Sequence, residues 1–105
     1  MRILFDQGTP APLRKFLVGH SVQLAFDLGW SRLSNGRLLT AAEGAGFDLL
    51  VTTDQNLPYQ QNLTSRPLAI LVLPTTRWPQ IEGHIPEVVA AVNSIQPGDY
   101  QELAW

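Results

Sequence analysis

The sequence predicts an α/β fold, in which residues 1–105 form a single domain: a three-layer sandwich with a mostly parallel central sheet flanked by helices. Strand-like and helix-like segments alternate along the chain, which is the pattern of βαβ units. The segment 68–73, Leu-Ala-Ile-Leu-Val-Leu, is a continuous apolar run, typical of a strand buried on both faces. A length of 105 residues suits one core.

Five strands and three helices are expected. The expected strands are 2–6, 20–26, 47–53, 68–73 and, at an edge of the sheet, 100–105. The expected helices are 9–19, 35–45 and roughly 81–95, with a polar loop or short helix at 54–62 and a connection at 74–78. Thr9 is suited to cap the first helix, and Ser34 or Asn35 the second. Gly19 is suited to end the first helix, and Gly44 and Gly46 the second.

The amino-acid composition favours some classes of protein and excludes others. A hydrophobic content of 45% and a charged content of 15% are those of a folded globular chain. The net charge of −2, with scattered Lys and Arg, gives no support to broad phosphate contacts with duplex nucleic acid. No cysteine is present, so disulfides and thiolate metal sites are excluded, and a reducing cytoplasm fits. No apolar run approaches the ~18 residues of a membrane span, and neither a signal peptide nor a membrane partner is expected.

Two apolar segments each end in an aspartate, the first, 3–5, in Asp6 and the second, 49–53, in Asp54. If these segments are neighbouring parallel strands, both carboxylates lie at the carboxyl edge of the sheet, where ligands bind in open α/β sheets. Taken singly, Asp6 can be a helix cap and Asp54 the start of an Asx turn. As a pair they predict a shared polar site, and their hard oxygen atoms suit a divalent cation such as Mg²⁺ or Mn²⁺.

Metal-dependent hydrolysis of a phosphodiester uses several converging carboxylates. Asp27, in the loop after the second expected strand, is the further candidate by position. Glu43 lies near the end of the second helix and is expected to be solvated, and Asp48 begins a strand and is expected at the opposite edge. Only Asp27 therefore qualifies as a third carboxylate.

Amides are crowded around Asp54 and at the other loops of the same edge. Each alone is expected to be solvated, but as a group they predict a hydrogen-bonded network around a polar pocket. The amides proposed to support this pocket are Gln7, Asn35, Gln55, Asn56, Gln60 and Gln61. The tryptophans at 30, 78 and 105 are expected to be packing or interface residues, because the strands lack interleaved aromatics.

Several short motifs of this chain together are typical of one family. They are Met1-Arg-Ile-Leu-Phe-Asp6, Gly19-His20-Ser-Val22, Leu28-Gly29-Trp30, Asn35-Gly36-Arg-Leu38-Leu39, Gly46-Phe47-Asp48 and Thr52-Thr-Asp54-Gln-Asn56-Leu-Pro-Tyr-Gln60-Gln61-Asn62-Leu63. With these motifs the chain resembles the small bacterial PIN-like domains of the PIN nuclease superfamily, which includes the toxins of many toxin–antitoxin pairs. The resemblance covers nearly the whole chain and is strongest in residues 1–63.

The resemblance implies a PIN-like sandwich with an acidic pocket and Mg²⁺- or Mn²⁺-dependent cleavage of RNA. It implies that Asp6 and Asp54 are the catalytic metal-site residues, and that the partners are RNA and a small antitoxin protein, with a homodimer as a further possible assembly. The chain departs from the family pattern at Gln7, at Asn56 and in the segment Asn35-Gly36-Arg37, where relatives commonly carry acidic residues. Arg37 adds positive charge near a pocket that is therefore depleted in carboxylates.

Three functions remain open from the sequence. The first is a PIN-like ribonuclease that acts as the toxin of a toxin–antitoxin pair, and the second is a catalytically inactive PIN-like module that binds RNA or a protein partner. The third is an unrelated flavodoxin-like binding or phosphoacceptor domain. Such a domain usually has a lysine near the pocket, whereas Lys15 is expected inside the first helix.

Overall fold

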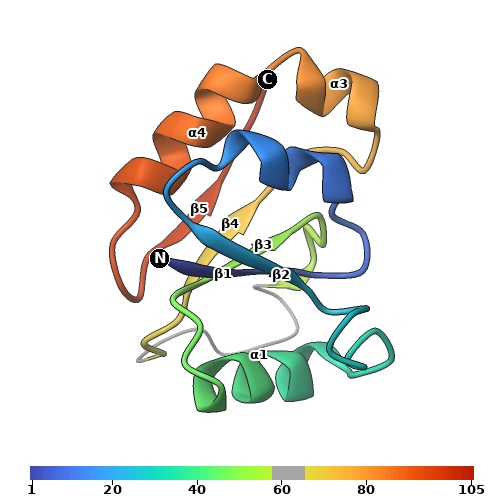
Figure 1. Ribbon diagram of the computed structural model, residues 1–105, viewed down its shortest axis with the longest axis vertical. Coiled ribbons are helices and arrows are strands. Elements are labelled where there is room, and N and C mark those ends of the chain that lie inside the picture. The colour runs from blue at the N-terminus through green and yellow to red at the C-terminus, as the bar shows by residue number, and fades with distance from the viewer. Residues whose placement is uncertain (58–65) are drawn as a thin grey trace.

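The computed structural model has three layers, with a sheet between two layers of helices (Figure 1). It describes residues 1–57 and 66–105. The strands are β1 (Arg2–Phe5), β2 (Ser21–Leu24), β3 (Leu49–Thr52), β4 (Ala69–Val72) and β5 (Tyr100–Glu102). The helices are the 3-10 helix η1 (Ala11–Phe16) and the α-helices α1 (Asn35–Gly44), α3 (Trp78–Glu82) and α4 (Ile85–Ser94). The predicted α/β class is confirmed.

The five strands pair in the order β2-β1-β3-β4-β5, and every pairing is parallel. From β1 the chain moves outward in one direction to β2, and from β3 it moves in the other direction to β4 and β5. The order therefore reverses between β1 and β3. This order is also that of flavodoxin-like doubly wound sheets.

Each face of the sheet carries its own core, because successive side chains of a strand point to opposite faces. Ile3, Phe5 and Val51 belong to the cluster that also contains apolar residues of η1, α3 and α4. Leu4 and Leu50 belong to the cluster under α1. All four residues of β3 and of β4 are buried, which explains their continuous apolar sequences.

The first helix differs from its prediction. A helix over 9–19 with Thr9 as its cap was expected, but the structure has a six-residue 3-10 helix that starts after Pro10. Thr9 is buried, and its hydroxyl does not cap the helix. Its single hydrogen is directed toward Oδ1 of Asp6 and the carbonyl oxygen of Val51. The helix therefore begins without a side-chain cap.

The last predicted helix, 81–95, is two helices. Trp78, expected in a connection, begins α3, and the chain breaks at Gly83 and His84 before α4 begins at Ile85. Pro86 explains the new start, because proline is favoured in the first turn of a helix, where its missing N–H is not needed.

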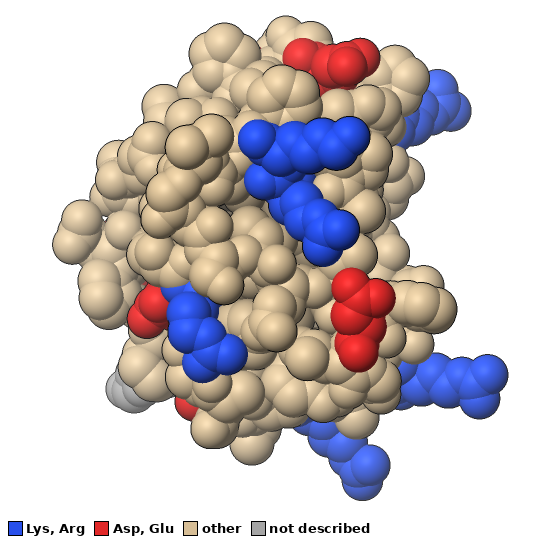
Figure 2. Space-filling model, viewed as in Figure 1, with Lys and Arg blue, Asp and Glu red and all other residues tan. Residues whose placement is uncertain are grey.

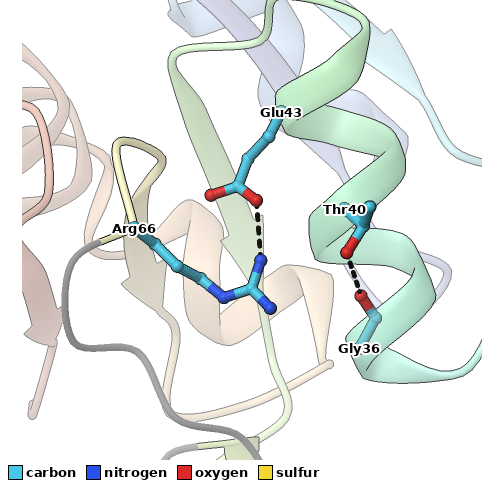
Figure 3. A network of polar contacts seen from close by, with 4 residues as sticks. All are labelled: Gly36, Thr40, Glu43 and Arg66. Atoms are coloured by element: carbon cyan, nitrogen blue, oxygen red, sulfur yellow. Dashed lines mark hydrogen bonds and ion pairs between the residues drawn. The ribbon is translucent and has the colours of Figure 1, made fainter.

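The predictions for Glu43 and for the end of the second strand are also corrected. Glu43 was expected to be solvated, but its Oε1 lies 2.7 Å from Nη1 of Arg66 in an ion pair between α1 and the segment before β4 (Figure 3). Strand β2 ends at Leu24 rather than residue 26, because the Leu24 carbonyl oxygen accepts the N–H of Asp27 in a turn. Phe26 consequently lies beyond the strand, with 68% of its surface exposed.

Among the helices of the described ranges, none has the length and apolar character that a membrane crossing requires.

Candidate functional site

Asp6 and Asp54 lie beyond the carboxyl ends of β1 and β3, the two strands between which the sheet order reverses. The strands pair directly, with Ile3 opposite Leu49 and Phe5 opposite Val51. Leu13 of η1, after β1, belongs to the apolar cluster on one face of the sheet, whereas Leu57, after β3, belongs to the cluster on the other face. A divergence of this kind opens a crevice at the carboxyl edge of doubly wound sheets. Both aspartates therefore lie at the carboxyl edge of the sheet, as the strand-end pattern predicted.

The hydroxyl of Thr52 joins the two aspartate segments. It donates a short hydrogen bond to Oδ2 of Asp6 and accepts the backbone N–H of Asp54 over 3.1 Å. Thr52 is the last residue of β3 and is only 2% exposed, so its hydroxyl needs protein partners. One side chain thus fixes both the carboxylate of Asp6 and the backbone that carries Asp54.

The turn after β1 holds the other oxygen of Asp6. The N–H of Thr9 donates to the carbonyl oxygen of Asp6 over 3.2 Å, which closes a β-turn, and the Thr9 hydroxyl lies 2.7 Å from Asp6 Oδ1. Gly8 occupies this turn because a Cβ there would lie 2.5 Å from Oγ1 of Thr53. A larger residue at position 8 would therefore force the Thr53 side chain to move.

The carboxylate of Asp54 is oriented by two donors. Oδ2 accepts the side-chain amide of Asn35, the first residue of α1, over 2.8 Å, and Oδ1 accepts the backbone N–H of Asn56 over 2.9 Å. The bond to Asn56 is the Asx turn that was one interpretation of Asp54. Among the described residues, three of the four carboxylate oxygens in the pair therefore accept one hydrogen bond each, and Asp6 Oδ1 shares the single Thr9 hydroxyl hydrogen with the Val51 carbonyl oxygen. Lone pairs remain on all four oxygens.

The other predicted pocket residues divide into three groups. Gln7 and Arg37 are exposed at the same edge, and in the part of the chain that the structure describes their side chains have no polar partner. Gln55 turns away from Asp54 and donates to the carbonyl oxygen of Pro74 over 2.9 Å. Gln60 and Gln61 lie outside the described residues.

No third carboxylate joins the pair within residues 1–57 and 66–105. Asp27 is exposed beyond β2, and no group of three or more Asp, Glu, His or Cys suited to a metal ion is found in these ranges. Asp48 lies at the opposite edge, as expected, where its Oδ2 accepts the N–H of Arg2 over 2.8 Å. The acidic site is therefore limited to the pair Asp6 and Asp54.

Basic residues occur in the loops of the carboxyl edge. Arg32 lies in the connection from β2 to α1, Arg37 in the first turn of α1, and Arg77 at the start of α3. All three are exposed. Figure 2 shows basic side chains that project at the right-hand margin, the side to which β1 and β2 point in Figure 1, and an acidic patch on the same side.

A cavity of about 390 Å³ adjoins Asp6. It is formed by the turn after β1, the end of β2 and the connection into α3. Its lining includes Asp6, Gln7, Thr9, Phe26, Thr76 and Trp78. A larger cavity of about 540 Å³ lies at the opposite edge of the sheet, near His20, Asp48 and Asn93, and contains neither aspartate of the pair.

Sequence reasoning missed Thr52, Thr9, Phe26 and Trp78 as parts of this edge. Thr52 was recognisable in principle, because a hydroxyl at the end of a fully apolar strand must find a buried partner. The alternation of apolar residues at 22, 24 and 26 indicated that Phe26 is a buried strand residue instead. Trp78 was assigned to packing, and it does pack against the core beside Phe16, with ring centroids 6.0 Å apart.

Comparison of the chain with protein-family models, with curated proteins and with solved structures finds no match in any of the three.

Proposed function

We propose that the domain is a divalent-cation-dependent ribonuclease whose site is Asp6 and Asp54. The observation that carries the proposal is the position of both carboxylates at the reversal point of the sheet, with Thr52 joining their segments. In keeping with the PIN-like resemblance, the proposal includes a toxin-like role with a small antitoxin protein as partner.

The donor set fits a hard cation. Mg²⁺ is commonly bound through one or two carboxylates together with phosphate groups of the substrate, and it retains several waters. Asp6 and Asp54 supply two such carboxylates, each with lone pairs left after its hydrogen bonds to protein. When bound, the cation would supply charge neutralisation and an activated water.

The residues around the pair have positioning roles in this proposal. Thr52 and Thr9 keep the carboxylate of Asp6 in one orientation, and Asn35 does so for Asp54. The exposed arginines Arg32 and Arg37 would attract the phosphates of RNA to an edge that is otherwise acidic.

The test is cleavage of a labelled RNA by the purified full chain in Mn²⁺. We expect Asp6→Asn and Asp54→Asn each to lower the cleavage rate on the order of 100-fold or more, because each removes a charged ligand. The matched control is Asp27→Asn, which changes an exposed carboxylate outside the pair and is expected to leave the rate unchanged. Cleavage that survives both substitutions within the pair would eliminate the mechanism.

A second candidate is a catalytically inactive module that binds RNA. The observation in its favour is that no third acidic ligand is found among the described residues and that all four oxygens of the pair already lie within hydrogen-bond distance of a protein donor. In the same experiment this candidate predicts a wild-type chain that binds RNA and cleaves none of it in Mn²⁺.

A further inference from the structure

We infer that the cavity beside Asp6 holds one unstacked base of single-stranded RNA, with Phe26 as the stacking surface. The choice of RNA as the ligand rests on the proposed function, whereas the base-binding geometry stands on the cavity itself. Its volume of about 390 Å³ falls in the roughly 300–1,000 Å³ range of small-ligand sites. A single base with part of its ribose suits that space.

Two aromatic side chains line this cavity from different elements. Phe26 follows β2 and is 68% exposed, whereas Trp78 opens α3 and is held by the core and by Phe16. Bases stack on aromatic rings when RNA is recognised as a single strand. Trp78 thus provides a fixed wall of the cavity, and Phe26 lines the same cavity while most of its surface is exposed to solvent.

The polar lining provides groups for the edge of a base. Gln7 lies on the exposed turn after Asp6, and its side-chain amide has no polar partner among residues 1–57 and 66–105. An amide presents one acceptor and two donors, which matches the mixed donor and acceptor edge of a base. Thr76, in the connection to α3, adds a hydroxyl-bearing residue to the same lining.

The cavity lies close to both the carboxylate pair and the exposed Arg77. Asp6 itself lines the cavity, so a base bound there places the adjoining phosphate near the proposed cleavage site. Arg77 directly precedes Trp78 and is exposed, where it can contact the phosphate on the other side of the base. The larger cavity at the opposite edge offers no such relation to the pair.

The test measures binding of a fluorescein-labelled oligoadenylate to the full chain by fluorescence anisotropy, with EDTA present to prevent cleavage. We expect Phe26→Ala to weaken binding at least about fivefold, the lower end of the loss from removing one base stack. Phe26→Tyr keeps the ring and is expected to bind within about twofold of wild type. The matched control is Val18→Ala, which truncates an apolar side chain that is 86% exposed and lies outside the cavity.

A second probe separates stacking from phosphate attraction. An abasic oligonucleotide with the same number of phosphates should bind weakly, and Phe26→Ala should not weaken it further. Equal binding of oligoadenylate by wild type and Phe26→Ala, or no binding by wild type, would overturn the inference. Binding that depends on Phe26 without any cleavage in Mn²⁺ would keep the inference and reject the ribonuclease. RNA cleavage and oligoadenylate binding that are both unchanged by Phe26→Ala would support the ribonuclease and reject the base-binding inference.

Discussion

Thr52 shows how a single buried hydroxyl can determine the geometry of a site. It ends a strand whose residues are all buried, and its Oγ1 contacts both the Asp6 carboxylate and the Asp54 backbone. A buried polar group without partners is costly, so these contacts stabilise the fold as well as the site. Asp6 and Thr52 are 46 residues apart in the sequence, and only the parallel pairing of β1 and β3 brings them together.

We predict that Thr52→Val lowers the free energy of unfolding by about 1–3 kcal/mol, because the Asp6 carboxylate loses a buried donor and the Asp54 N–H an acceptor. Urea unfolding measures the change. Thr52→Ser retains the hydroxyl and is expected to recover most of the loss. A Val variant as stable as wild type would show that the bridge contributes nothing to folding.

At the scale of the element, α1 is held at its carboxyl end by two arginines from outside the helix. Arg2 donates to the carbonyl oxygen of Ala45, directly after the helix, and its guanidinium lies 4.6 Å from the centroid of the Phe47 ring. Arg66 pairs with Glu43 in the last turn (Figure 3). Because the carboxyl end of a helix has partial negative charge, cations there are favourable and an unpaired glutamate is not.

We predict that Glu43→Gln lowers the free energy of unfolding by about 1 kcal/mol, since Arg66 then loses a charged partner in a partly buried pair. Thermal unfolding at low and high salt measures the effect, which should shrink as salt screens the pair. The control is Glu82→Gln on α3, an exposed glutamate expected to change stability by less than about 0.5 kcal/mol. A Glu43→Gln variant with equal or higher stability would contradict this account.

At the scale of the whole molecule, burial is unequal across the sheet. β3 and β4 lie inside the sheet and are covered on both faces, whereas β2 lies at an edge and half of its residues are exposed. The N–H of Ser21 donates to the carbonyl oxygen of Met1, and the N–H of Ala25 donates to that of Phe5. Because backbone N–H groups alternate in direction along a strand, the N–H of Val22 points away from the sheet. The protein should therefore open from its edges before its centre.

We predict that native-state hydrogen exchange is slowest at the amides of Val51 and Leu71 and fast at Val22. NMR-detected exchange of the backbone amides provides the measurement. Gln23 is the internal control, because alternation directs its N–H toward β1, and it should exchange more slowly than Val22. Equal protection of Val22 and Val51 would mean that the β2 edge is covered in solution.

Local sequence was sufficient for much of the fold. The continuous apolar runs placed β3 and β4 inside the predicted strands 47–53 and 68–73. Helix α1 begins at Asn35 as expected and is followed by Gly46, whose φ of 81° is the left-handed conformation that glycine adopts after a helix end. These elements are encoded locally, because burial on two faces demands unbroken apolar residues and glycine ends a helix at little cost. The same patterns predicted that the aspartates after β1 and β3 would share an edge.

By itself, then, the sequence determined the α/β class, the alternation of elements and the edge that carries Asp6 and Asp54. Tertiary structure decided what these elements contact: the Thr52 bridge, the pairing of Glu43 with Arg66, and the exposure of Phe26 at a cavity beside Asp6. Periodicity reports only whether a residue is buried. The partner of a buried or exposed side chain comes from segments far away in the chain, and packing of the sheet against its helices is what brings them together.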